Sequence, residues 1–231
     1  MKILNLMVKG KDGTRELAFP VKRMVNAGYV GRDQEAVKKH IEELKREDVP
    51  APEEVPTLYP VASYLITTGG VLEVVEQANS GEAEFVFLLQ EGQIYVGAGS
   101  DHTDRKLEAD SIIKAKQMCP NVISPVVWPY VEMEAAWDDL ELRSWVERDG
   151  KRILYQEAKL SAILSPEDLL SFVREKVKDG DLENMVIFSG TIAALGGEMM
   201  SGEAFEVELH DPERDDSLWC KYGVRLLDYV K

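Results

Sequence analysis

The sequence predicts a β-rich α+β domain with a rolled, barrel-like sheet. Short apolar stretches of strand length follow one another from Tyr59 onward, whereas only three segments have the 3.6-residue period of a helix. No internal repeat, low-complexity tract or linker divides the 231 residues. Many short strands with few helices are typical of this fold class. We therefore expect a single domain over residues 1–231.

The first 56 residues are predicted to form a hairpin and a helical segment. The apolar runs KILNLMV and RELAFPVK flank the turn KGKDGT, which predicts a hairpin over residues 2–22. Asp33 is the predicted cap of a helix that runs to about Glu47. His40 lies in the same stripe as the apolar positions of this helix, which are Ala36, Val37, Ile41 and Leu44. The prolines of VPAPEEVPTLYP end the helix, and we expect an extended crossing segment there.

Two tight turns and two further helices organise the rest of the chain. Glu91-Gly92 separates EFVFLL from QIYVGAG, and Asp149-Gly150 separates DLELRSWVE from RILYQEA, so both pairs predict hairpins. The segment LEADSIIKAKQ predicts one helix over residues 107–117. Ser165 predicts the start of another, because a proline and two acids follow this capping serine. Three final strands are predicted over residues 184–190, 204–210 and 221–230.

The composition indicates a soluble, acidic and cytoplasmic protein. The chain has 27 Lys and Arg residues against 42 Asp and Glu residues, and its formal net charge of −15 argues against binding to nucleic acid or to an anionic membrane. No apolar run approaches the roughly 20 residues of a transmembrane helix, and the N-terminus lacks the pattern of a signal peptide. Cys119 and Cys220 stand far apart, so we expect two free thiols in a reducing compartment.

The densest group of potential metal ligands lies around the first of these two hairpins. Glu82 and Glu84 stand two residues apart, so on a strand both side chains point to the same face. Asp101, at the end of the paired strand, could complete a site of three carboxylates, which favours Mg²⁺ or Mn²⁺ over Zn²⁺ or copper. His102 is a backup ligand that we expect to point to the other face. The alternative is a solvated strand face, because acidic side chains are ordinarily exposed.

A second group of candidates could act on a proton. His40 and Glu43 stand three residues apart on the predicted helix, where a carboxylate can orient an imidazole that serves as a general base. A core-facing histidine beside a solvated glutamate is the alternative. Lys114 and Lys116 follow the acidic group, and either of them could bind a carboxylate or stabilise an enolate. Surface charges are again the alternative.

Glycine-containing motifs give little further information. Ser189-Gly190-Thr191 ends a predicted strand, where a glycine allows the backbone to approach a ligand closely, although a plain loop fits equally well. The sequence contains no phosphate-binding loop, G-x-G-x-x-G fingerprint, G-x-S-x-G elbow or H-E-x-x-H motif. Motifs therefore do not support hydride transfer, phosphoryl transfer or serine hydrolysis.

Taken in order, these segments resemble the fumarylacetoacetate hydrolase superfamily, over about residues 30–212. That superfamily typically has an N-Y-x-x-H-x-x-E segment, a proline-rich stretch, an E-x-E strand, an N-D-x-[ST]-x-R segment, a lysine, a glutamine after a hairpin and a G-T-P-x-G turn. The matching residues here are His40 with Glu43, the connector VPAPEEVPTLYP, Glu82 with Glu84, Ser100 to Arg105, Lys116, Tyr155-Gln156 and Ser189 to Thr191. The sequence segments SGEAE, GSDHTDR and CPN are most similar to those of a branch of uncharacterised bacterial proteins in that superfamily.

The resemblance implies the mixed β-sheet roll of that superfamily, assembled as a homodimer. The implied activity is metal-dependent hydrolysis of a carbon–carbon bond in a 1,3-diketone or an acylpyruvate-like acid, with Mg²⁺ or Mn²⁺ as cofactor and a small oxo acid as substrate. The segment over residues 26–56 is implied to be a mobile lid. The implied metal ligands are Glu82, Glu84 and Asp101, the implied catalytic residues are His40, Glu43 and Lys116, and the implied substrate-binding residues are Arg105, Gln156, Gly190 and Thr191.

Other functions remain open at this point. The same metal site could support decarboxylation of a 2-oxo acid, or dehydration or hydration of a sugar acid. A binding or assembly protein that kept the sheet but lost turnover is a further alternative, although the H-x-x-E pair argues against it. A cupin-like metalloprotein is disfavoured because the acidic group contains a single histidine.

Overall fold

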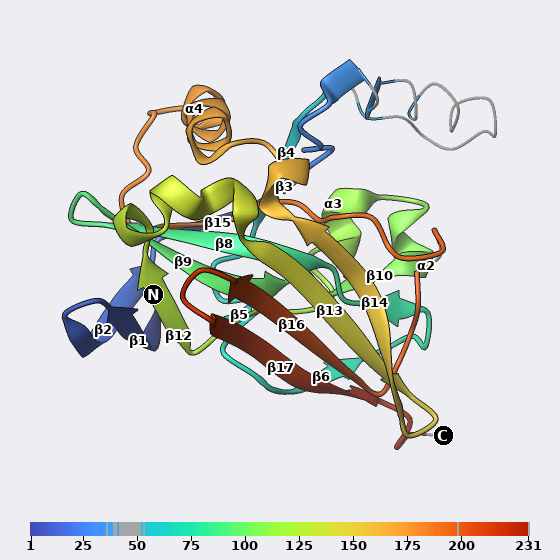
Figure 1. Cartoon of the computed structure of the whole chain (residues 1–231). Helices are drawn as coiled ribbons and strands as arrows, with labels where there is room; N and C mark the ends of the chain where they lie inside the picture. The colour runs from blue at the N-terminus through green and yellow to red at the C-terminus, as the bar shows by residue number, and fades with distance from the viewer. Residues whose placement is uncertain (36, 39–40, 42–51, 53, 198, 231) are drawn as a thin grey trace.

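The computed structural model describes residues 1–35, 37–38, 41, 52, 54–197 and 199–230. Two large sheets dominate this part of the chain (Figure 1), and they confirm the predicted β-rich α+β class. The larger, mixed sheet has the strand order β2-β1-β12-β9-β8-β15-β3-β4, with β11 and β5 joined to it through β9. Its strands are β1 (Lys2–Gly10), β2 (Gly13–Val21), β3 (Arg23–Gly28), β4 (Thr57–Val61), β5 (Ile66–Thr67), β8 (Ala83–Gln90), β9 (Gln93–Ser100), β11 (Asn121–Ile123), β12 (Val126–Pro129) and β15 (Met185–Phe188).

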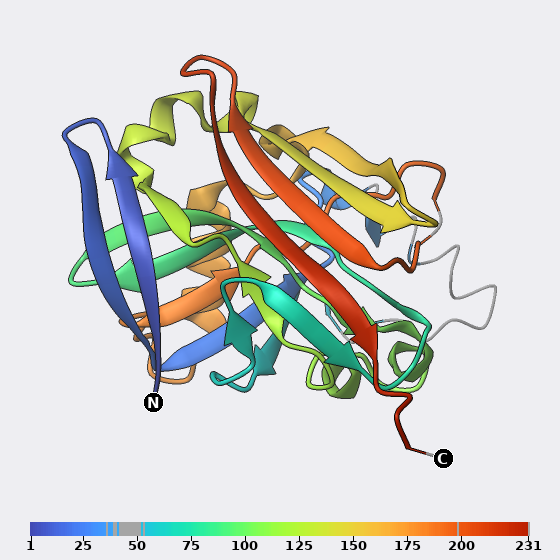
Figure 2. The same ribbon diagram turned by 90° about the horizontal axis from the view of Figure 1, so that it is seen from below.

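The smaller sheet lies across the larger one, as the view from below shows (Figure 2). Its order is β14-β13-β16-β17-β6, and β9 contacts both β16 and β17. Its strands are β6 (Gly70–Val74), β13 (Glu141–Arg148), β14 (Lys151–Lys159), β16 (Ala204–Asp211) and β17 (Asp216–Leu226). A short pair, β7 (Asn79–Ser80) with β10 (Thr103–Asp104), stands apart from both sheets.

The predicted hairpins form with the expected turns. β1 pairs with β2 in antiparallel register, as β8 does with β9 and β13 with β14. Glu91 and Asp149 both have a positive φ and precede a glycine that also has one, which is the backbone that a two-residue hairpin turn requires. The strands predicted over residues 184–190, 204–210 and 221–230 correspond to β15, β16 and β17. β17 begins five residues earlier than predicted, at Asp216.

The structure refines two predictions about the connecting segments. Residues 57–60, at the end of the proline-rich connector that we expect to be extended, form strand β4 together with Val61 on the edge of the larger sheet, where a proline costs no ladder bond on the open side. The single helix predicted over residues 107–117 is two short helices, α2 (Arg105–Glu108) and α3 (Ile112–Ala115). The Asp104 side chain caps α2 by accepting from two backbone amides, and Ser111 has an extended backbone that separates the two helices.

The helix predicted at Ser165 is α4 (Pro166–Lys176), and its cap is the predicted one. The Ser165 hydroxyl accepts a hydrogen bond from the Asp168 amide at 3.1 Å, and Pro166 occupies the first turn. Leu169 and Val173 lie on its buried face. Three short 3₁₀ helices complete the described elements: η1 (Tyr130–Glu132), η2 (Glu134–Asp139) and η3 (Leu160–Ala162). None of the helices in the described ranges has the length and apolar character needed to cross a membrane.

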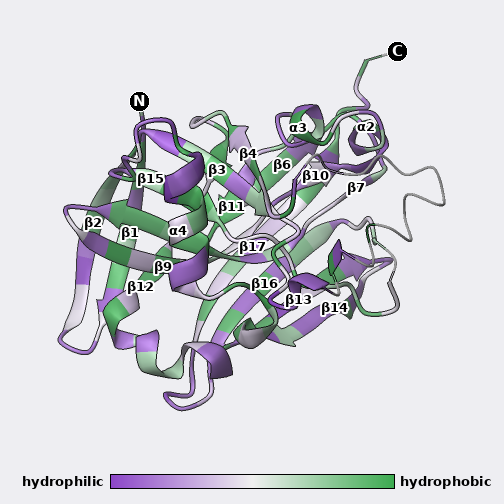
Figure 3. Ribbon diagram, turned by 90° about the horizontal axis from the view of Figure 1, so that it is seen from above, coloured by the Kyte–Doolittle hydropathy of each residue, from purple (hydrophilic) through white to green (hydrophobic). Residues whose placement is uncertain are grey.

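The central strands β8 and β15 of the larger sheet are buried on both faces, and β8 contributes to both cores. Ala83, Phe85 and Phe87 face the core between the two sheets, whereas Val86 and Leu88 face the core closed by the N-terminal hairpin. Successive side chains of a strand alternate between faces, so Glu82 and Glu84 continue the row of Val86 and Leu88 beyond the end of the second core. Figure 3 shows green, hydrophobic stretches on the larger sheet, for example next to β12. Glu82 lies just before β8 and Glu84 near its start, and the residues from Phe85 to Leu89 are all apolar.

An aromatic cluster fills the core between the sheets. The Phe87 ring lies 5.0 Å from that of Phe85, 5.5 Å from that of Trp137 and 5.7 Å from that of Tyr130, measured between centroids. Trp137 also meets Phe85 edge to face at 4.9 Å. Because β8 also carries the two glutamates, this cluster holds the strand on which the candidate site depends.

Phe87→Ala should therefore lower the free energy of unfolding by about 3–5 kcal/mol, the usual cost of a phenylalanine-sized cavity in a packed core. Urea denaturation of both proteins measures the difference. Val131→Ala is the control: Val131 belongs to the adjacent η1 but is 72% exposed, so its loss should stay within about 0.5 kcal/mol. Equal losses in the two variants would contradict this account of the core.

Candidate metal centre and cleft

Three carboxylates meet where β8 begins and β9 ends. Glu82 and Asp101 face each other across the paired strands, because each backbone amide donates to the other residue's carbonyl at 3.1 Å. The side chains of Glu82, Glu84 and Asp101 each offer an oxygen, and these oxygens all lie within 4.8 Å of one another. All three residues are buried. The structure thus brings together the three carboxylates that the spacing singled out.

Burial makes the charge of this cluster costly. It raises the pKa of Glu82 and raises that of Glu84 well above its usual value, in both cases because the ionised form loses water. Burial alone would also raise the pKa of Asp101, but the adjacent Lys116 ammonium outweighs it and lowers that pKa. Of the three carboxylates, Asp101 is therefore the one whose ionised form the chain stabilises most.

Lys116 is the lysine that reaches the cluster. Its ammonium hydrogen-bonds to Asp101 and lies 3.9 Å from Glu82. Burial alone would lower the pKa of Lys116, but the carboxylates of Asp101, Glu82 and Glu84 raise it, so the side chain stays protonated. Lys114, the other candidate, is exposed on α3. The structure thus separates the two lysines that the sequence left open.

Arg105 lies beside Glu82 at the start of α2. Its Nε donates to the Ser80 hydroxyl at 2.6 Å, and its Nη1 donates to Glu108 at 2.7 Å. Its Nη2 lies 3.2 Å from a Glu82 oxygen, yet makes no hydrogen bond within the described part of the chain. The guanidinium is therefore fixed by two partners and keeps one donor free.

The loop after β15 closes the other side of the cluster. The Gly190 amide donates to the Glu84 carboxylate at 2.8 Å. Gly190 has φ = +83°, and a Cβ there would lie 2.4 Å from a Val30 methyl carbon and 2.9 Å from the Ala27 carbonyl oxygen, so only glycine fits. Thr191 donates from its hydroxyl to the Ala83 carbonyl at 2.9 Å and also lines the cleft.

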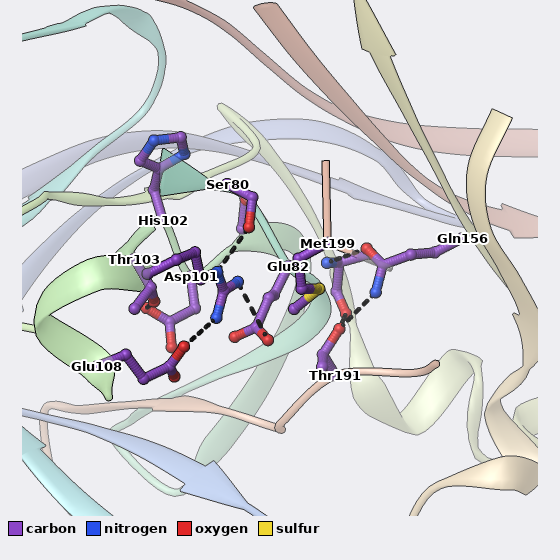
Figure 4. A network of polar contacts seen from close by, with 12 residues as sticks. Ser80, Glu82, Asp101, His102, Thr103, Glu108, Gln156, Thr191 and Met199 are labelled. Carbon is purple, nitrogen blue, oxygen red and sulfur yellow. Dashed lines mark hydrogen bonds and ion pairs between the residues drawn. The ribbon is translucent and has the colours of Figure 1, made fainter. Parts of the chain in front are cut away.

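Gln156 is fully buried, and its side-chain amide forms hydrogen bonds with other residues of the chain. Its oxygen accepts from the Ala83 amide, and its nitrogen donates to Thr191 and to the Ile192 carbonyl (Figure 4). It does not line the cleft. In this structure Gln156 ties β14 to β8 and to the Thr191 loop.

His102 belongs to a separate buried network. Its Nδ1 lies 3.0 Å from the Tyr222 hydroxyl and its Nε2 lies 2.8 Å from the Asn79 side-chain oxygen. Burial lowers the pKa of His102 to about 4, so the ring is neutral at physiological pH. Within the described residues it is not part of the carboxylate cluster, which agrees with the expectation that it points to the other face.

A cleft of about 650 Å³ opens in front of the carboxylates. Its polar lining residues are Glu82, Glu84, Arg105, Glu108, Lys116 and Thr191. Its remaining lining residues are Ala27, Gly28, Tyr29, Val30, Gly31, Val37, Tyr59, Ile112, Ala193 and Met199. Glu108, Tyr29, Tyr59 and Met199 were not predicted as site residues. The i, i+3 spacing of Arg105 and Glu108 was a usable signal for Glu108, whereas no sequence pattern marks the other three.

His40 and Glu43, the predicted general base and its partner, lie outside the described residues. Among their neighbours, residues 34–35, 37–38 and 41 are helical, which agrees with the predicted helix, and Val37 lines the cleft.

The donor set fits a hard divalent cation. Carboxylate oxygens are the ligands that Mg²⁺ and Mn²⁺ prefer, and an ion needs them deprotonated. A cation at the cluster would offset the burial and the repulsion from Asp101 that together raise the pKa of Glu84. Beside it, Lys116 and the free Arg105 donor could hold the oxygens of an anionic ligand. The arrangement suits an acid that chelates a metal.

Solved structures with the same fold include several metal-dependent enzymes. A protein named Cg1458, solved with an inhibitor, is 17% identical with a TM-score of 0.65, over 92% of this chain and 80% of that one. A 2-keto-3-deoxy-D-arabinonate dehydratase complexed with magnesium and 2,5-dioxopentanoate is 15% identical with a TM-score of 0.62, over 93% and 78%. A 4-oxalocrotonate decarboxylase from Pseudomonas putida G7, complexed with calcium and acetate, is 14% identical with a TM-score of 0.57, over 88% and 76%.

The dehydratase and the decarboxylase are members of the fumarylacetoacetate hydrolase superfamily, so the resemblance is confirmed at the level of the fold. The comparison with curated proteins gave no match. The family model described as "Protein of unknown function (DUF2848)" matches residues 27–222, which is most of the chain. The chain belongs to this family and has the sheet roll of the fumarylacetoacetate hydrolase superfamily.

Proposed function

We propose that this protein is a divalent-metal-dependent hydrolase that cleaves a carbon–carbon bond in a 1,3-diketone or an acylpyruvate-like acid. The observation that carries the proposal is the buried cluster of Glu82, Glu84 and Asp101 at the base of a cleft that also holds Lys116 and Arg105. Structures of the same fold that were solved with magnesium or calcium and with small acids support it further.

In this proposal Glu82, Glu84 and Asp101 hold a Mg²⁺ or Mn²⁺ ion. When bound, such an ion supplies Lewis-acid polarisation of a substrate oxygen. Gly190 fixes the Glu84 carboxylate through its amide, and Lys116 fixes Asp101. The two ligands are thereby oriented before a substrate arrives, which is what precise chelation requires.

The remaining residues bind the acid and move protons. Arg105 and Lys116 donate to the carboxylate and oxo oxygens, and Thr191 offers a further hydrogen bond. Gly190 and Gln156 contribute by positioning Glu84 and Thr191. His40, oriented by Glu43, takes a proton from water as the water oxygen attacks the carbonyl carbon. The carbon–carbon bond then breaks, and the carbon that keeps the electron pair is protonated to give the second product.

Decarboxylation of a 2-oxo acid, or dehydration of a sugar acid, is the second candidate. It is favoured by two of the similar structures, which are those of a dehydratase and a decarboxylase. These reactions use the same carboxylates and the same cation-bearing side chains. They differ from hydrolysis in the role of water, since loss of CO₂ needs no water activated as a nucleophile.

We further propose that the chain acts as a cytoplasmic homodimer. Two observations are compatible with a reducing compartment: Cys119 and Cys220 are both free thiols, and both are buried. The dimer follows from the resemblance to the superfamily.

Glu84→Gln should weaken Mg²⁺ binding by at least about 100-fold, because a lost ligand should cost more than the 10- to 100-fold typical of a supporting residue. Calorimetric titration of metal-free protein measures the affinity. Glu73→Gln is the matched control, since Glu73 is exposed and paired with Arg225 away from the cleft. Unchanged affinity in Glu84→Gln would remove Glu84 from the metal site.

The same variant has an expected pH signature without metal. Burial raises the pKa of Glu84 above 4.5, so its contribution to stability is full below that pH and is lost as the pH rises through the folded-state pKa. In EDTA, Glu84→Gln should therefore be more stable than wild type at pH 8, with the difference shrinking toward pH 5. Urea denaturation at both pH values measures it, and a variant less stable at pH 8 would contradict the cost assigned to this charge.

Lys116→Gln should weaken the binding of oxalate, a 2-oxo-acid mimic, by about 10- to 100-fold in the presence of Mg²⁺. That range corresponds to a lost charge-assisted hydrogen bond of about 1.5–3 kcal/mol. Lys114→Gln removes the same charge two residues away, on an exposed side chain, and should bind oxalate as wild type does. Equal affinities for the two variants would mean that Lys116 does not meet the ligand.

His40→Ala should retain Mg²⁺ and oxalate binding while kcat for an acylpyruvate falls by about 10²- to 10⁴-fold, the usual contribution of a general base. Glu43→Gln should give a smaller loss. Steady-state kinetics and melting temperature are measured on the same variants. A lower melting temperature with kcat near wild type would instead make His40 a packing residue, and retained decarboxylation of oxaloacetate would favour the second candidate reaction.

A further inference from the structure

The charges of the cleft are largely matched within the chain. Lys116 is paired with Asp101, and Arg105 is paired with Glu108 and Glu82. Among the described residues that line the cleft, Lys116 is the only lysine and Arg105 is the only arginine. The Arg105 Nη2 atom lies 3.2 Å from a Glu82 oxygen but makes no hydrogen bond within the described residues, so it can still donate to an incoming carboxylate oxygen.

The total charge limits what the cleft can take. Four carboxylates, those of Glu82, Glu84, Asp101 and Glu108, and two cations leave two negative charges, which one divalent ion neutralises. A substrate with one carboxylate can use the free Arg105 donor. Among the described lining residues, a second carboxylate would find no further cation, and it would be repelled by Glu108.

The rest of the described cleft wall is apolar or aromatic. Tyr29 and Val30 follow β3, Tyr59 lies on β4, and Ile112 begins α3. Met199 comes from the loop before β16 and is drawn beside Glu82 in Figure 4. Groups of this kind gain free energy by covering an apolar chain, whereas a polyhydroxylated chain would lose hydrogen bonds to water against them.

The fold gives room for the aromatic part of this wall. Gly28 stands beside Tyr59, and a Cβ at Gly28 would lie 3.0 Å from the Tyr59 ring and 2.8 Å from the Thr57 hydroxyl. The next residue, Tyr29, has φ = +57°, which turns the chain at the end of β3. The Lys116 ammonium lies 5.7 Å from the centre of the Tyr59 ring. The aromatic wall therefore adjoins the charged end of the cleft directly.

We propose that the substrate is a monocarboxylic 2-oxo acid with an uncharged, apolar group at its far end. The wall of Tyr29, Tyr59, Ile112 and Met199 receives that group, and the charge balance of the described part of the cleft disfavours dicarboxylic acids. The inference rests on the proposed function, since it needs the metal and the Arg105 donor to hold the oxo-acid end.

The test compares three stable oxamates that share one metal-chelating end. Oxamate has no tail, N-propyloxamate has an apolar tail, and N-oxalylglycine has a carboxymethyl tail of similar size. Dissociation constants are measured by calorimetry on wild-type protein saturated with Mg²⁺. N-propyloxamate should bind more tightly than oxamate by about fourfold for each buried methylene, and at least about tenfold more tightly than N-oxalylglycine.

Two variants place a new cation in the apolar wall. Met199 is 43% exposed, so Met199→Lys should fold, and it should shift the affinity ratio toward N-oxalylglycine by at least about tenfold. Met118→Lys is the matched control: Met118 is 44% exposed but does not line the cleft, so the ratio should stay at the wild-type value. Ala193→Lys, at another exposed lining position, provides the second variant should Met199→Lys lower the melting temperature.

The outcomes separate the inference from the proposed function. If all three oxamates bind only when Mg²⁺ is present but N-oxalylglycine binds most tightly, the proposed function stands and the inference is overturned. An unchanged ratio in both lysine variants likewise overturns the part assigned to the apolar wall. If none of the oxamates binds with Mg²⁺, the proposed function fails and the inference fails with it.

Discussion

The burial of three carboxylates at one point is the constraint on which the site depends. Glu82, Glu84 and Asp101 would repel one another without compensation, and the chain supplies only part of it through Lys116 and Arg105. The backbone amide of Gly190 offsets a further part at Glu84. What remains is a local excess of negative charge in a water-poor place, which is the condition that a divalent cation relieves.

The strand that carries two of these acids explains how the fold tolerates them. β8 is buried on both faces, so its apolar residues Phe85, Val86 and Phe87 secure it in two cores at once. Glu82 and Glu84 lie at the start of this strand, beyond the second core, and both line the cleft. The stability that the apolar residues contribute allows the strand to hold charges that would be unfavourable on a marginal element. The same strand therefore connects the aromatic cluster to the acidic cluster.

Local patterns predicted the parts of the molecule that depend on local chemistry. The hairpin turns, the Ser165 cap and the shared face of Glu82 and Glu84 each follow from a few adjacent residues, and all of them appear in the structure. The features that local patterns did not predict depend on residues far apart in the sequence or on the backbone conformation of one residue. Strand β4 exists because β3 offers it an edge, and Tyr59 reaches the cleft only through that pairing. Likewise, periodicity could not divide residues 107–117 into α2 and α3, because the division rests on the backbone at Ser111.

Within this fold, the metal cluster and the outcome of the reaction are separable. In our proposal, chelation of an oxo acid requires only the carboxylates and the cations beside them. The outcome depends on where a proton is taken and where it is delivered, and this falls to groups outside the cluster, such as His40 in our proposal. In the same proposal the far end of the substrate meets a third set, the aromatic and apolar wall, which belongs to other elements of the chain. Because these three sets lie on different segments, a change in one alters substrate or reaction while leaving the sheet and its buried charges intact.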